Sequence, residues 1–346
     1  MARRILWASL ALAPISIALH YLADVGDAGE FVLASAALVP LAWLIGEATE
    51  HAAHHTGPGI GGFLNATFGN APELIIALLA VNEGLTEVVR GSLTGSVVGN
   101  LLLVLGFSLL FGGRGSLDRE SSLVSIALVS VAVLLLLIPS VPGWEGDPER
   151  DSLVRLSIPV SVVLLLLYLA TTWVALRRHR LMHVSDEPDA MVGWSFRTAM
   201  IVLGIATLIT ALIAEIVVGS IEVFAEDVGL SEFFVAAVIV AIVGNAAEHG
   251  GAVVVAARGK IKLAAEIALA SSAQVAVFLI PAVTLLALVI DPLSLALRPV
   301  EIGALAFGVV LTLALLVQGR SSRLRGVVLI AGYVAVAVAF FMSGDR

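Results

Sequence analysis

Two short stretches decide the fold of this chain. The first is Gly244-Asn245-Ala246-Ala247-Glu248-His249, which lies inside an apolar run that extends from Phe233 to Ala257. The second is Gly69-Asn70-Ala71-Pro72-Glu73, which lies inside another apolar run. Carboxylates are rarely buried in apolar surroundings unless they have a partner. The glutamate in each stretch therefore indicates a site around which the rest of the chain is organised.

The composition is that of an integral membrane protein. The chain has 346 residues, of which 59% are hydrophobic and 13% are charged, and its mean hydropathy is +1.05. A soluble protein carries roughly 25% charged residues. The chain has no cysteine, which excludes disulfides, thiolate metal sites and thiol catalysis. The net charge of −8 does not suggest nucleic acid as a partner, and the lipid bilayer is the expected one.

Eleven segments are long and apolar enough to cross a bilayer, which takes about 20 residues. They cover residues 5–22, 31–53, 61–82, 91–112, 121–139, 153–176, 197–219, 232–257, 264–290, 300–317 and 326–342. Loop-forming sequences such as Thr56-Gly57-Pro58-Gly59 separate them. The first segment also resembles a signal peptide, but no soluble domain follows it. We therefore interpret it as a transmembrane helix, with an uncleaved signal as the alternative.

The basic residues predict the orientation of the chain. If the N-terminus is cytosolic and each segment crosses once, 14 of the 19 Lys and Arg residues lie in cytosolic connections, as the positive-inside rule requires. The C-terminus is then outside. The remaining arginines fall on the outside, at Arg90, Arg150, Arg155, Arg298 and Arg346. The outside connections are also acidic, and these acids are either solvated turns or a field that gathers cations.

The two glutamate motifs belong to an internal repeat. They are 175 residues apart, and the same offset pairs Ser96 with Ser271 and Glu47 with Glu222. Five predicted crossings separate the motifs, so the two copies enter the membrane in opposite directions. Inverted repeats of this kind place a site near the bilayer midplane, at discontinuous helices. We therefore predict an all-α integral membrane protein of eleven helices, with an extra N-terminal helix (1–30), a first five-helix repeat (31–176), a cytosolic linker (177–196) and an inverted second repeat (197–346).

Each motif has the residue types of an interrupted helix. Gly69 and Gly244 permit backbone conformations that a regular helix does not have. Asn followed three residues later by Glu resembles a capping box, and Pro72 suits the first turn of a restarted helix. We expect a break or kink at each glycine, with backbone carbonyls freed beside it. An ordinary kink with a capping glutamate is the alternative.

The polar side chains of the two copies form an all-oxygen set. Hard cations choose oxygen ligands, and Ca²⁺ takes about six to eight of them. Two carboxylates balance one divalent cation, and in a low-dielectric site they would bind protons once the cation leaves. Occupation by either Ca²⁺ or two protons is the electrostatic basis of an antiporter, in which both ions are substrates and no cofactor is needed. The candidate ligands are Glu73, Glu248, Asn70, Asn245, Ser96 and Ser271.

Seven stretches of the chain share motifs with a known transporter family. They are Glu47-Ala48-Thr49-Glu50, Thr56-Gly57-Pro58, residues 64–70, Gly95-Ser96, residues 100–106, residues 244–249 and residues 271–275. In these stretches the chain resembles the Ca²⁺/H⁺ exchanger (CAX) family of the cation/Ca²⁺ exchanger superfamily. The resemblance extends from the second predicted span to the ninth. His249 after Glu248 is its most specific mark, since Na⁺/Ca²⁺ exchangers share the inverted repeats but not this pair.

The resemblance implies a role for each matching polar residue. Glu73 and Glu248 would be the central cation and proton ligands, assisted by Asn70, Asn245, Ser96, Ser271 and Gln274. Glu50 and Glu222 would be acids on the access path, and His249 would either carry protons or orient Glu248. Two departures affect these roles. Pro72 stands where relatives have Val or Thr, and the linker has only Asp186, Glu187 and Asp189 where many relatives have a longer acidic helix.

The implied activity is transport and not enzymatic catalysis. The expected protein is a secondary active antiporter that moves cytosolic Ca²⁺ out in exchange for H⁺ by alternating access, in a cell membrane. A Na⁺/Ca²⁺ or broader cation exchanger on the same scaffold is the alternative, and a cation channel is a more distant one. The oligomeric state stays open. Near the cytosolic end of the second span, Glu47, Glu50, His51 and His54 fall at helical spacing on one face, and His51 and His55 are four residues apart. They suggest an ion access path, a Zn²⁺ site or solvated interface residues.

Overall fold

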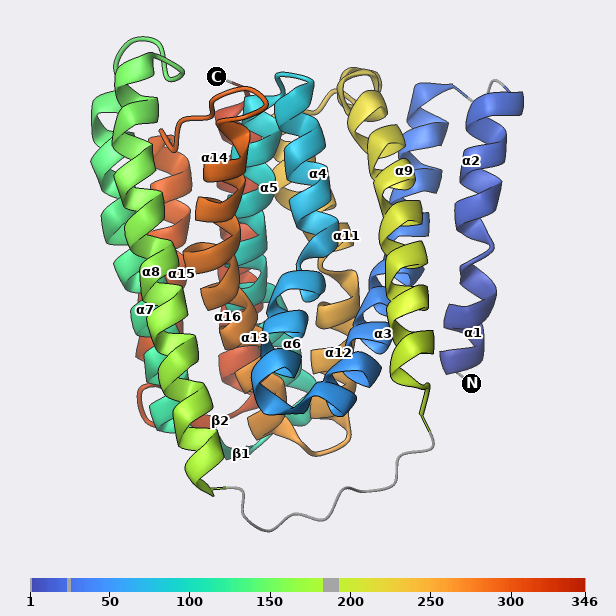
Figure 1. The fold of residues 1–346 in the computed structure, drawn as a ribbon. Helices are drawn as coiled ribbons and strands as arrows, with labels where there is room; N and C mark the ends of the chain where they lie inside the picture. The colour runs from blue at the N-terminus through green and yellow to red at the C-terminus, as the bar shows by residue number, and fades with distance from the viewer. Residues whose placement is uncertain (1, 24–25, 183–192, 346) are drawn as a thin grey trace.

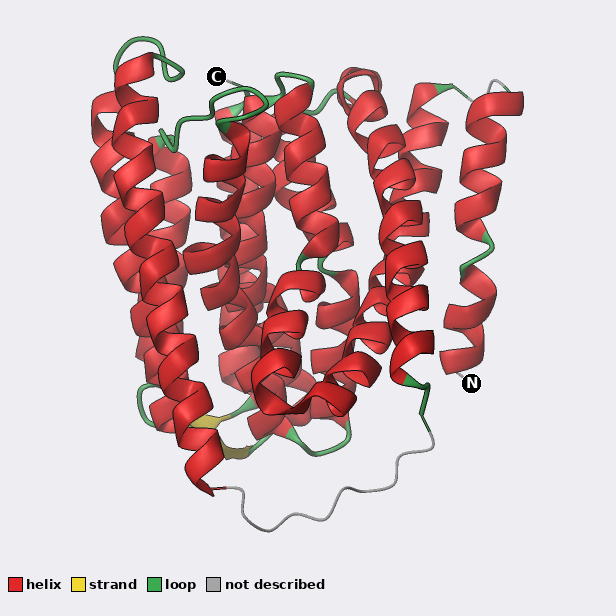
Figure 2. Ribbon diagram, viewed as in Figure 1, coloured by secondary structure: helices red, strands yellow, loops and turns green. Residues whose placement is uncertain are grey.

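The computed structural model describes residues 2–23, 26–182 and 193–345. In this part of the chain, nine helices are long and apolar enough to cross a membrane, or ten if the bent pair Glu232–Gly244 and Glu248–Ala257 counts as one span. The described strands are two residues each, β1 (Gly115–Ser116) and β2 (Arg320–Ser321), and they pair antiparallel. Figures 1 and 2 show a bundle that is almost entirely helical, as the composition predicts.

The first half of the chain begins with a divided helix. The elements are α1 (Ala2–Ser9), α2 (Leu12–Leu22), α3 (Asp27–Gly69), α4 (Ala71–Asn82), α5 (Thr86–Val98), the π-helical segment η1 (Gly99–Val104), α6 (Leu105–Gly112), α7 (Arg119–Gly143) and α8 (Asp151–Met182). The predicted first span is interrupted between α1 and α2, because Pro14 cannot bond to the carbonyl of Leu10 and its ring collides with it.

Helices α3 and α8 are longer than the sequence predicts. The predicted turn at Thr56-Gly57-Pro58-Gly59 lies within α3, because a proline removes one helical hydrogen bond and bends a helix without always ending it. Figure 1 shows α3 changing direction along the lower face of the bundle. Helix α8 continues to Met182, into the predicted linker. The acidic linker residues Asp186, Glu187 and Asp189 lie outside the described residues.

The second half of the chain contains another divided span. The elements are α9 (Phe196–Val228), α10 (Glu232–Phe234), η2 (Val235–Val240), α11 (Ala241–Gly244), α12 (Ala246–Ala257), α13 (Ile261–Gln274), η3 (Val275–Leu279), α14 (Ile280–Ala287), α15 (Pro299–Leu316) and α16 (Arg323–Ser343). The segments η2 and η3 are π-helical. Such segments are frequent at functional sites.

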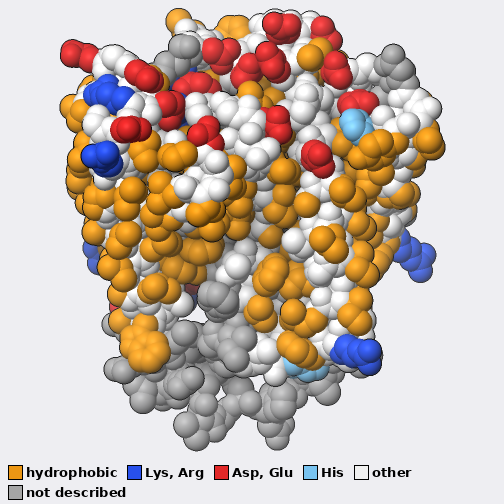
Figure 3. Space-filling view, turned by 45° about the horizontal axis from the view of Figure 1, so that its top comes forward, with side chains coloured by type: hydrophobic (Ala, Val, Ile, Leu, Met, Phe, Trp, Pro, Cys, Tyr) orange, Lys and Arg blue, Asp and Glu red, His pale blue; other side chains and the backbone are white. Residues whose placement is uncertain are grey.

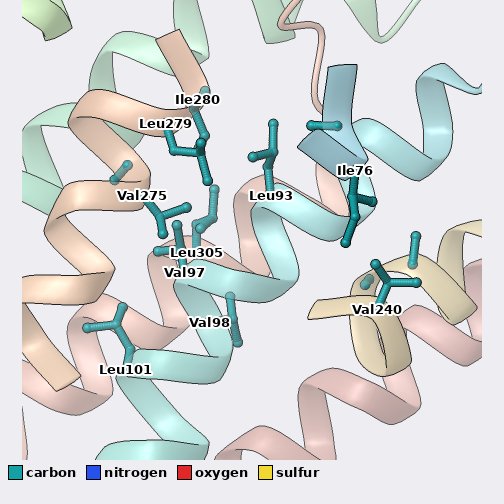
Figure 4. Packing of buried hydrophobic residues seen from close by; sticks show 14 of the residues in the cluster. Ile76, Leu93, Val97, Val98, Leu101, Val240, Val275, Leu279, Ile280 and Leu305 are labelled. Carbon is teal, nitrogen blue, oxygen red and sulfur yellow. The ribbon is translucent and has the colours of Figure 1, made fainter. Parts of the chain in front are cut away.

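Helix α5 lies at the centre of the core. Every residue from Val88 to Val98 is buried, as expected for a helix that is packed on all sides. Figure 4 shows Leu93, Val97 and Val98 of α5 among apolar side chains from other segments. These neighbours include Ile76 of α4, Val240 of η2, Val275 and Leu279 of η3, and Leu305 of α15. Segments from both halves of the chain therefore pack on one helix.

Two arginines that the charge count assigns to outer connections are in fact buried. Arg90 is 2% exposed, and its guanidinium donates to Glu149 at 2.5 Å and to Glu87 at 3.0 Å. Arg298 is 7% exposed, lies 3.5 Å from a carboxylate oxygen of Glu87 and stands 3.5 Å from the centre of the Phe233 ring. Glu87 and Glu149 are therefore ion-pair partners of arginine, and not simply solvated outer acids.

Glu301 completes this network, and the sequence analysis does not single it out. It is fully buried, and its carboxylate accepts from the Thr94 hydroxyl at 3.2 Å and from the Arg298 backbone N–H at 2.7 Å. Buried charges are tolerated when they are paired and hydrogen-bonded. The network joins α5, α15 and the α7–α8 connection at one end of the bundle.

Charge is distributed unevenly over the surface. Figure 3 shows Asp and Glu side chains gathered on the upper face, with a broad apolar zone below them. Exposed acids of this face include Glu83, Glu145, Asp147, Glu226 and Asp227. The exposed basic residues Arg114, Arg258, Lys260, Arg320 and Arg323 belong to connections at the opposite end, where Figure 1 places β1 and β2.

Candidate functional site

The site lies where two helices are interrupted halfway through the bundle. Helix α3 ends at Gly69 and α4 begins at Ala71, while α11 ends at Gly244 and α12 begins at Ala246. The residues between them have nearly the same backbone geometry, with φ −97° and ψ 14° at Asn70 and φ −91° and ψ 6° at Asn245. Figure 2 shows both breaks at mid-height. Two interruptions of one shape thus lie at the same depth.

Each glutamate lies against the glycine of the other motif. A Cβ built on Gly69 would stand 3.4 Å from Oε1 of Glu248, and one built on Gly244 would stand 3.3 Å from Cγ of Glu73. Each opposing glutamate thus lies within van der Waals distance of the position that a Cβ would take on the glycine. The two motifs therefore interlock reciprocally, and carboxylates from two broken helices meet in one place.

Hydrogen bonds connect the motifs to serines on α5 and α13. The Asn245 amide donates to the Ser96 hydroxyl at 2.9 Å and to the Ala241 carbonyl at 2.9 Å. The Ser271 hydroxyl donates to the Glu248 carboxylate. Each serine therefore contacts a polar residue of the second motif.

Asn100 is a site residue to which the sequence analysis assigns no role. It is fully buried in η1, and its amide donates to the Ser271 hydroxyl at 3.1 Å. The hydroxyl proton of Ser271 is thereby directed to Glu248. Two signals in the sequence could have identified it: Asn100 is the polar residue within an apolar run, and it follows Ser96 by about one helical turn.

The expected capping boxes are wrong. Neither Asn70 nor Asn245 makes a side-chain cap to the helix that follows it. The Asn245 amide instead donates to the Ser96 hydroxyl and to the Ala241 carbonyl of the preceding helix. A buried polar group takes the partner that the tertiary structure offers, and here that partner comes from α5. Pro72 lies in the first turn of α4, where its missing N–H leaves no hydrogen bond unmade.

Several buried oxygens of the site have no hydrogen-bond partner among the described residues. They are Oε2 of Glu73, Oδ1 of Asn100 and Oδ1 of Asn245. Unsatisfied buried acceptors are rare and require an explanation. Glu73, Ser92 and Ser96 also line a cavity of about 10 Å³, near the smallest volume that holds one water. These acceptors suit a hard cation, and the carboxylate also suits a proton.

The described residues contain no group of three or more acidic, histidine or cysteine side chains placed to hold a metal. The two glutamates are the charged groups of the site, so a cation there would complete its shell with amide, hydroxyl and backbone oxygens. The helix breaks supply such carbonyls, because the end of a helix leaves backbone acceptors without helical partners.

The remaining predicted residues lie at the margin of this group or away from it. Gln274 is half-buried at the end of α13. His249 is half-buried, its Nε2 has no partner among the described residues, and its ring makes no hydrogen bond to Glu248. In this structure Ser271, and not His249, donates to the Glu248 carboxylate, and the role of His249 stays a prediction. Glu50 and Glu222 are exposed on α3 and α9, two helices that pack along each other.

Two histidines in the middle of α3 contact the start of the second half of the chain. His51 lies 3.7 Å from the Glu47 carboxylate and its ring packs against Trp194. The Nε2 atom of His55 lies 2.9 Å from the Trp194 carbonyl oxygen. These contacts tie α3 to the residue that precedes α9 and do not assemble the Zn²⁺ site that the spacing suggests.

Comparisons with known proteins match nearly the whole chain. The model of the sodium/calcium exchanger protein family matches residues 28–177 and 198–342. A Ca²⁺/H⁺ antiporter of Synechocystis sp. is 34% identical over 96% of this chain and 95% of its own length. The Ca²⁺/H⁺ antiporter ChaA of Bacillus subtilis is 39% identical over 90% of this chain and 92% of its own length. The solved structure of native YfkE superposes with a TM-score of 0.84, at 35% identity, over 97% of this chain and 99% of that one.

The family match covers both halves and leaves out the linker between them. Both helix breaks, both glutamates and both serines lie within the matched ranges. The two glutamate motifs, and the site that they form, therefore lie in the part of the chain that the family model matches. The chain belongs to the sodium/calcium exchanger protein family, among its cation/proton exchangers.

Proposed function

We propose that this protein is a secondary active antiporter that exchanges Ca²⁺ for H⁺ by alternating access at Glu73 and Glu248. The observation that carries the proposal is the reciprocal packing of each glutamate against the glycine of the other broken helix. The names of the two full-length relatives, both Ca²⁺/H⁺ antiporters, support the choice of substrates.

The charge of the site explains why exchange is coupled. Two carboxylates neutralise one Ca²⁺, and two protons neutralise the same carboxylates when the cation leaves. An empty site with two negative charges is unfavourable in surroundings of low dielectric constant. The site therefore reorients when it carries Ca²⁺ or protons and does not reorient when it is empty. Direct donation from Ser271 holds Glu248 in place during both halves of the cycle.

The proposed architecture has eleven crossings, of which spans 2–6 and 7–11 form two inverted repeats (31–176 and 197–346) after an extra N-terminal helix (1–30) and around a linker (177–196). The matched geometry of the breaks at Asn70 and Asn245 supports this arrangement. So do the π-helical segments, because the offset of 175 residues carries η1 at 99–104 onto 274–279, where η3 lies.

The proposed orientation places the acidic face outside and the basic connections in the cytosol of a cell membrane. The N-terminus is then cytosolic and the C-terminus is outside. The separation of charge along the bundle supports this orientation, since basic connections remain on the cytosolic side. In this orientation the proton gradient drives Ca²⁺ out of the cytosol.

The proposal is tested by ⁴⁵Ca²⁺ uptake into inside-out vesicles under an imposed pH gradient. We expect saturable uptake that collapses when the gradient is dissipated. Glu73→Gln and Glu248→Gln should each reduce uptake to background, because a single carboxylate cannot balance Ca²⁺. Glu145→Gln, at an exposed outer carboxylate, is the matched control and should retain uptake.

Three outcomes would contradict parts of the proposal. Full proton-driven uptake in either glutamine variant would show that the site is elsewhere. Uptake driven by a Na⁺ gradient and indifferent to pH would identify a Na⁺-coupled exchanger. Flux that does not saturate and moves no protons would identify a channel.

A further inference from the structure

Two connections from opposite halves of the chain are joined at the basic end of the bundle. One runs from α6 to α7 and carries β1, and the other runs from α15 to α16 and carries β2. Gly115 pairs with Ser321, the Leu117 N–H donates to the Gly319 carbonyl at 2.9 Å, and the Ser321 hydroxyl donates to the Gly113 carbonyl. The backbone of both connections is therefore held in one geometry.

An arginine from each of these two connections lines one cavity. Arg119 and Arg320, with Val317 and Gln318, line a cavity of about 600 Å³. The Nε atom of Arg119 donates to the Val317 carbonyl at 2.8 Å, which fixes the direction of that side chain. Arg325 donates to the Arg320 carbonyl and, at 3.1 Å, to the Gln318 side chain. The walls of the cavity are thus set by hydrogen bonds before any ligand binds.

The cationic groups of this cavity have no anionic partner in the described part of the chain. Neither Arg119 nor Arg320 forms an ion pair with a described carboxylate, and both are exposed. Asp118, the neighbouring acid, is occupied by Lys262 at 3.0 Å. The Arg119 guanidinium is held by the Val317 carbonyl, and no described carboxylate lines this cavity. Two guanidinium groups in such a place suit a phosphate, which arginine binds with paired hydrogen bonds.

A second cavity extends from Arg119 along the outward face of α7. It measures about 470 Å³ and is lined by Arg119, Glu120, Leu123, Val124 and Ala127. Val124 is 52% exposed on a helix that is long and apolar enough to cross a membrane, so this surface is accessible to lipid and is not part of the protein core. The two cavities share Arg119, and together they have a cationic part at the helix ends and an apolar part beside the helix.

We propose that these joined cavities bind one anionic phospholipid, with its phosphate at Arg119 and Arg320 and an acyl chain along Leu123 and Val124. The site lies where α7 begins and α15 ends, at the ends of two helices that are long and apolar enough to cross a membrane, and lipid headgroups are expected at such helix ends. Basic pockets at the cytosolic ends of membrane helices are suited to anionic headgroups. A bound lipid bridges α7 of the first half and the α15–β2 connection of the second, and so stabilises the bundle.

The test measures the thermal unfolding midpoint of the purified full-length protein in detergent. Phosphatidylglycerol should raise the midpoint of the wild type by more than phosphatidylcholine does. Arg119→Gln combined with Arg320→Gln should abolish this difference, and Arg320→Gln alone should reduce it without loss of folding, since the Arg320 side chain makes no described contact. Arg155→Gln, an exposed arginine at the other end of the bundle, is the control and should keep the full difference.

Two further arms separate a lipid from a free anion. Val124→Trp, which fills the apolar cavity, should reduce the effect of phosphatidylglycerol. Inorganic phosphate at matched ionic strength should leave the midpoint unchanged. The proposal is overturned if the arginine variants retain the full phosphatidylglycerol effect, if phosphatidylcholine acts equally, or if inorganic phosphate alone reproduces the shift.

Discussion

At the scale of single residues, the two serines of the repeat are not equivalent. Ser96 accepts a hydrogen bond from the neutral Asn245 amide, whereas Ser271 donates to the Glu248 carboxylate and is itself held by Asn100. A hydrogen bond to a charged group contributes about 1.5–3 kcal/mol and one between neutral groups about 0.5–1.5 kcal/mol. The hydrogen bond from Ser271 to Glu248 is therefore expected to contribute more free energy than the one from Asn245 to Ser96.

Ser271→Ala should impair Ca²⁺ binding more than Ser96→Ala does. Without this donor the ionised form of Glu248, which Ca²⁺ requires, is less stable relative to the protonated form. A free-energy change of about 1.4 kcal/mol corresponds to a tenfold change in affinity. We expect the half-saturating Ca²⁺ concentration of proton-driven uptake to rise roughly tenfold or more for Ser271→Ala, and by less for Ser96→Ala. The initial rate of uptake, measured against free Ca²⁺, checks this.

Ser272→Ala is the control for that comparison. The Ser272 hydroxyl is also buried, but it donates to the Val97 carbonyl at 3.3 Å and touches neither glutamate. Its loss should leave the half-saturating concentration near that of the wild type. Equal shifts for Ser96→Ala and Ser271→Ala would mean that the Asn100–Ser271–Glu248 chain has no special importance.

At the scale of elements, close packing of α5 against η2 positions the second break. Gly95 lies directly on the backbone of Ala237, and Gly91 lies against Phe233. Glycine leaves room for this approach, and α5 at the same time carries Ser96 to Asn245. The contact between α5 and η2, which we call the α5–η2 seam, therefore sets the distance between the first and second halves of the site.

Gly95→Ala should disturb both stability and transport. The added Cβ would collide with the carbonyl group of Ala237, and backbone cannot move aside as a flexible side chain can. Overpacking of this kind costs about 1–3 kcal/mol. We expect a lower thermal unfolding midpoint in detergent and slower Ca²⁺ uptake, because η2 and the break that follows it must shift.

Gly204→Ala provides the matched substitution in a helix. An added Cβ at Gly204 of α9 meets no atom within 4 Å. Alanine favours a helix over glycine by up to about 1 kcal/mol, so this variant should be as stable as the wild type or more so. If the Gly95→Ala protein keeps the thermal unfolding midpoint and the Ca²⁺ uptake of the wild type, then α5 and η2 can move apart without harm, and the prediction is wrong.

At the scale of the whole molecule, the inverted arrangement makes a prediction about sidedness. Three proposed crossings lie between Glu145 and Lys260, so these exposed residues should face opposite sides of the membrane. The chain has no cysteine, which makes single-cysteine labelling free of background. In intact cells, an impermeant maleimide should label Glu145→Cys, and it should label Lys260→Cys only after permeabilisation.

The unmodified chain serves as the blank in that experiment. Labelling of both positions in intact cells, or of neither, would refute an odd number of crossings between them and with it the inverted repeat. Labelling of Lys260→Cys alone would leave the repeat in place and reverse the orientation. The result therefore separates the architecture from its direction in the membrane.

The sequence by itself determined the helical membrane class of this protein and the two motifs that contain Glu73 and Glu248. Both conclusions depend on local information: the length of apolar runs, and ionisable residues that interrupt them. The spacing of Ser96 and Ser271 is one basis of the proposed repeat, because an offset is visible in the sequence without knowledge of any contact. The ends of the helices could not be predicted as well from the sequence, since α3 continues through a sequence that normally forms a turn.

Only the tertiary structure decided which partner each buried polar group has. Asn245 binds Ser96 across 149 residues and does not cap its own helix, and Asn100 reaches Ser271 across 171 residues. Arg90 and Arg298, which count as outer charges in the sequence, are buried and form ion pairs with Glu87, Glu149 and Glu301. The reason is physical: in a dry interior a polar group must be satisfied by whichever segment the fold brings beside it, and that neighbour is distant in the chain.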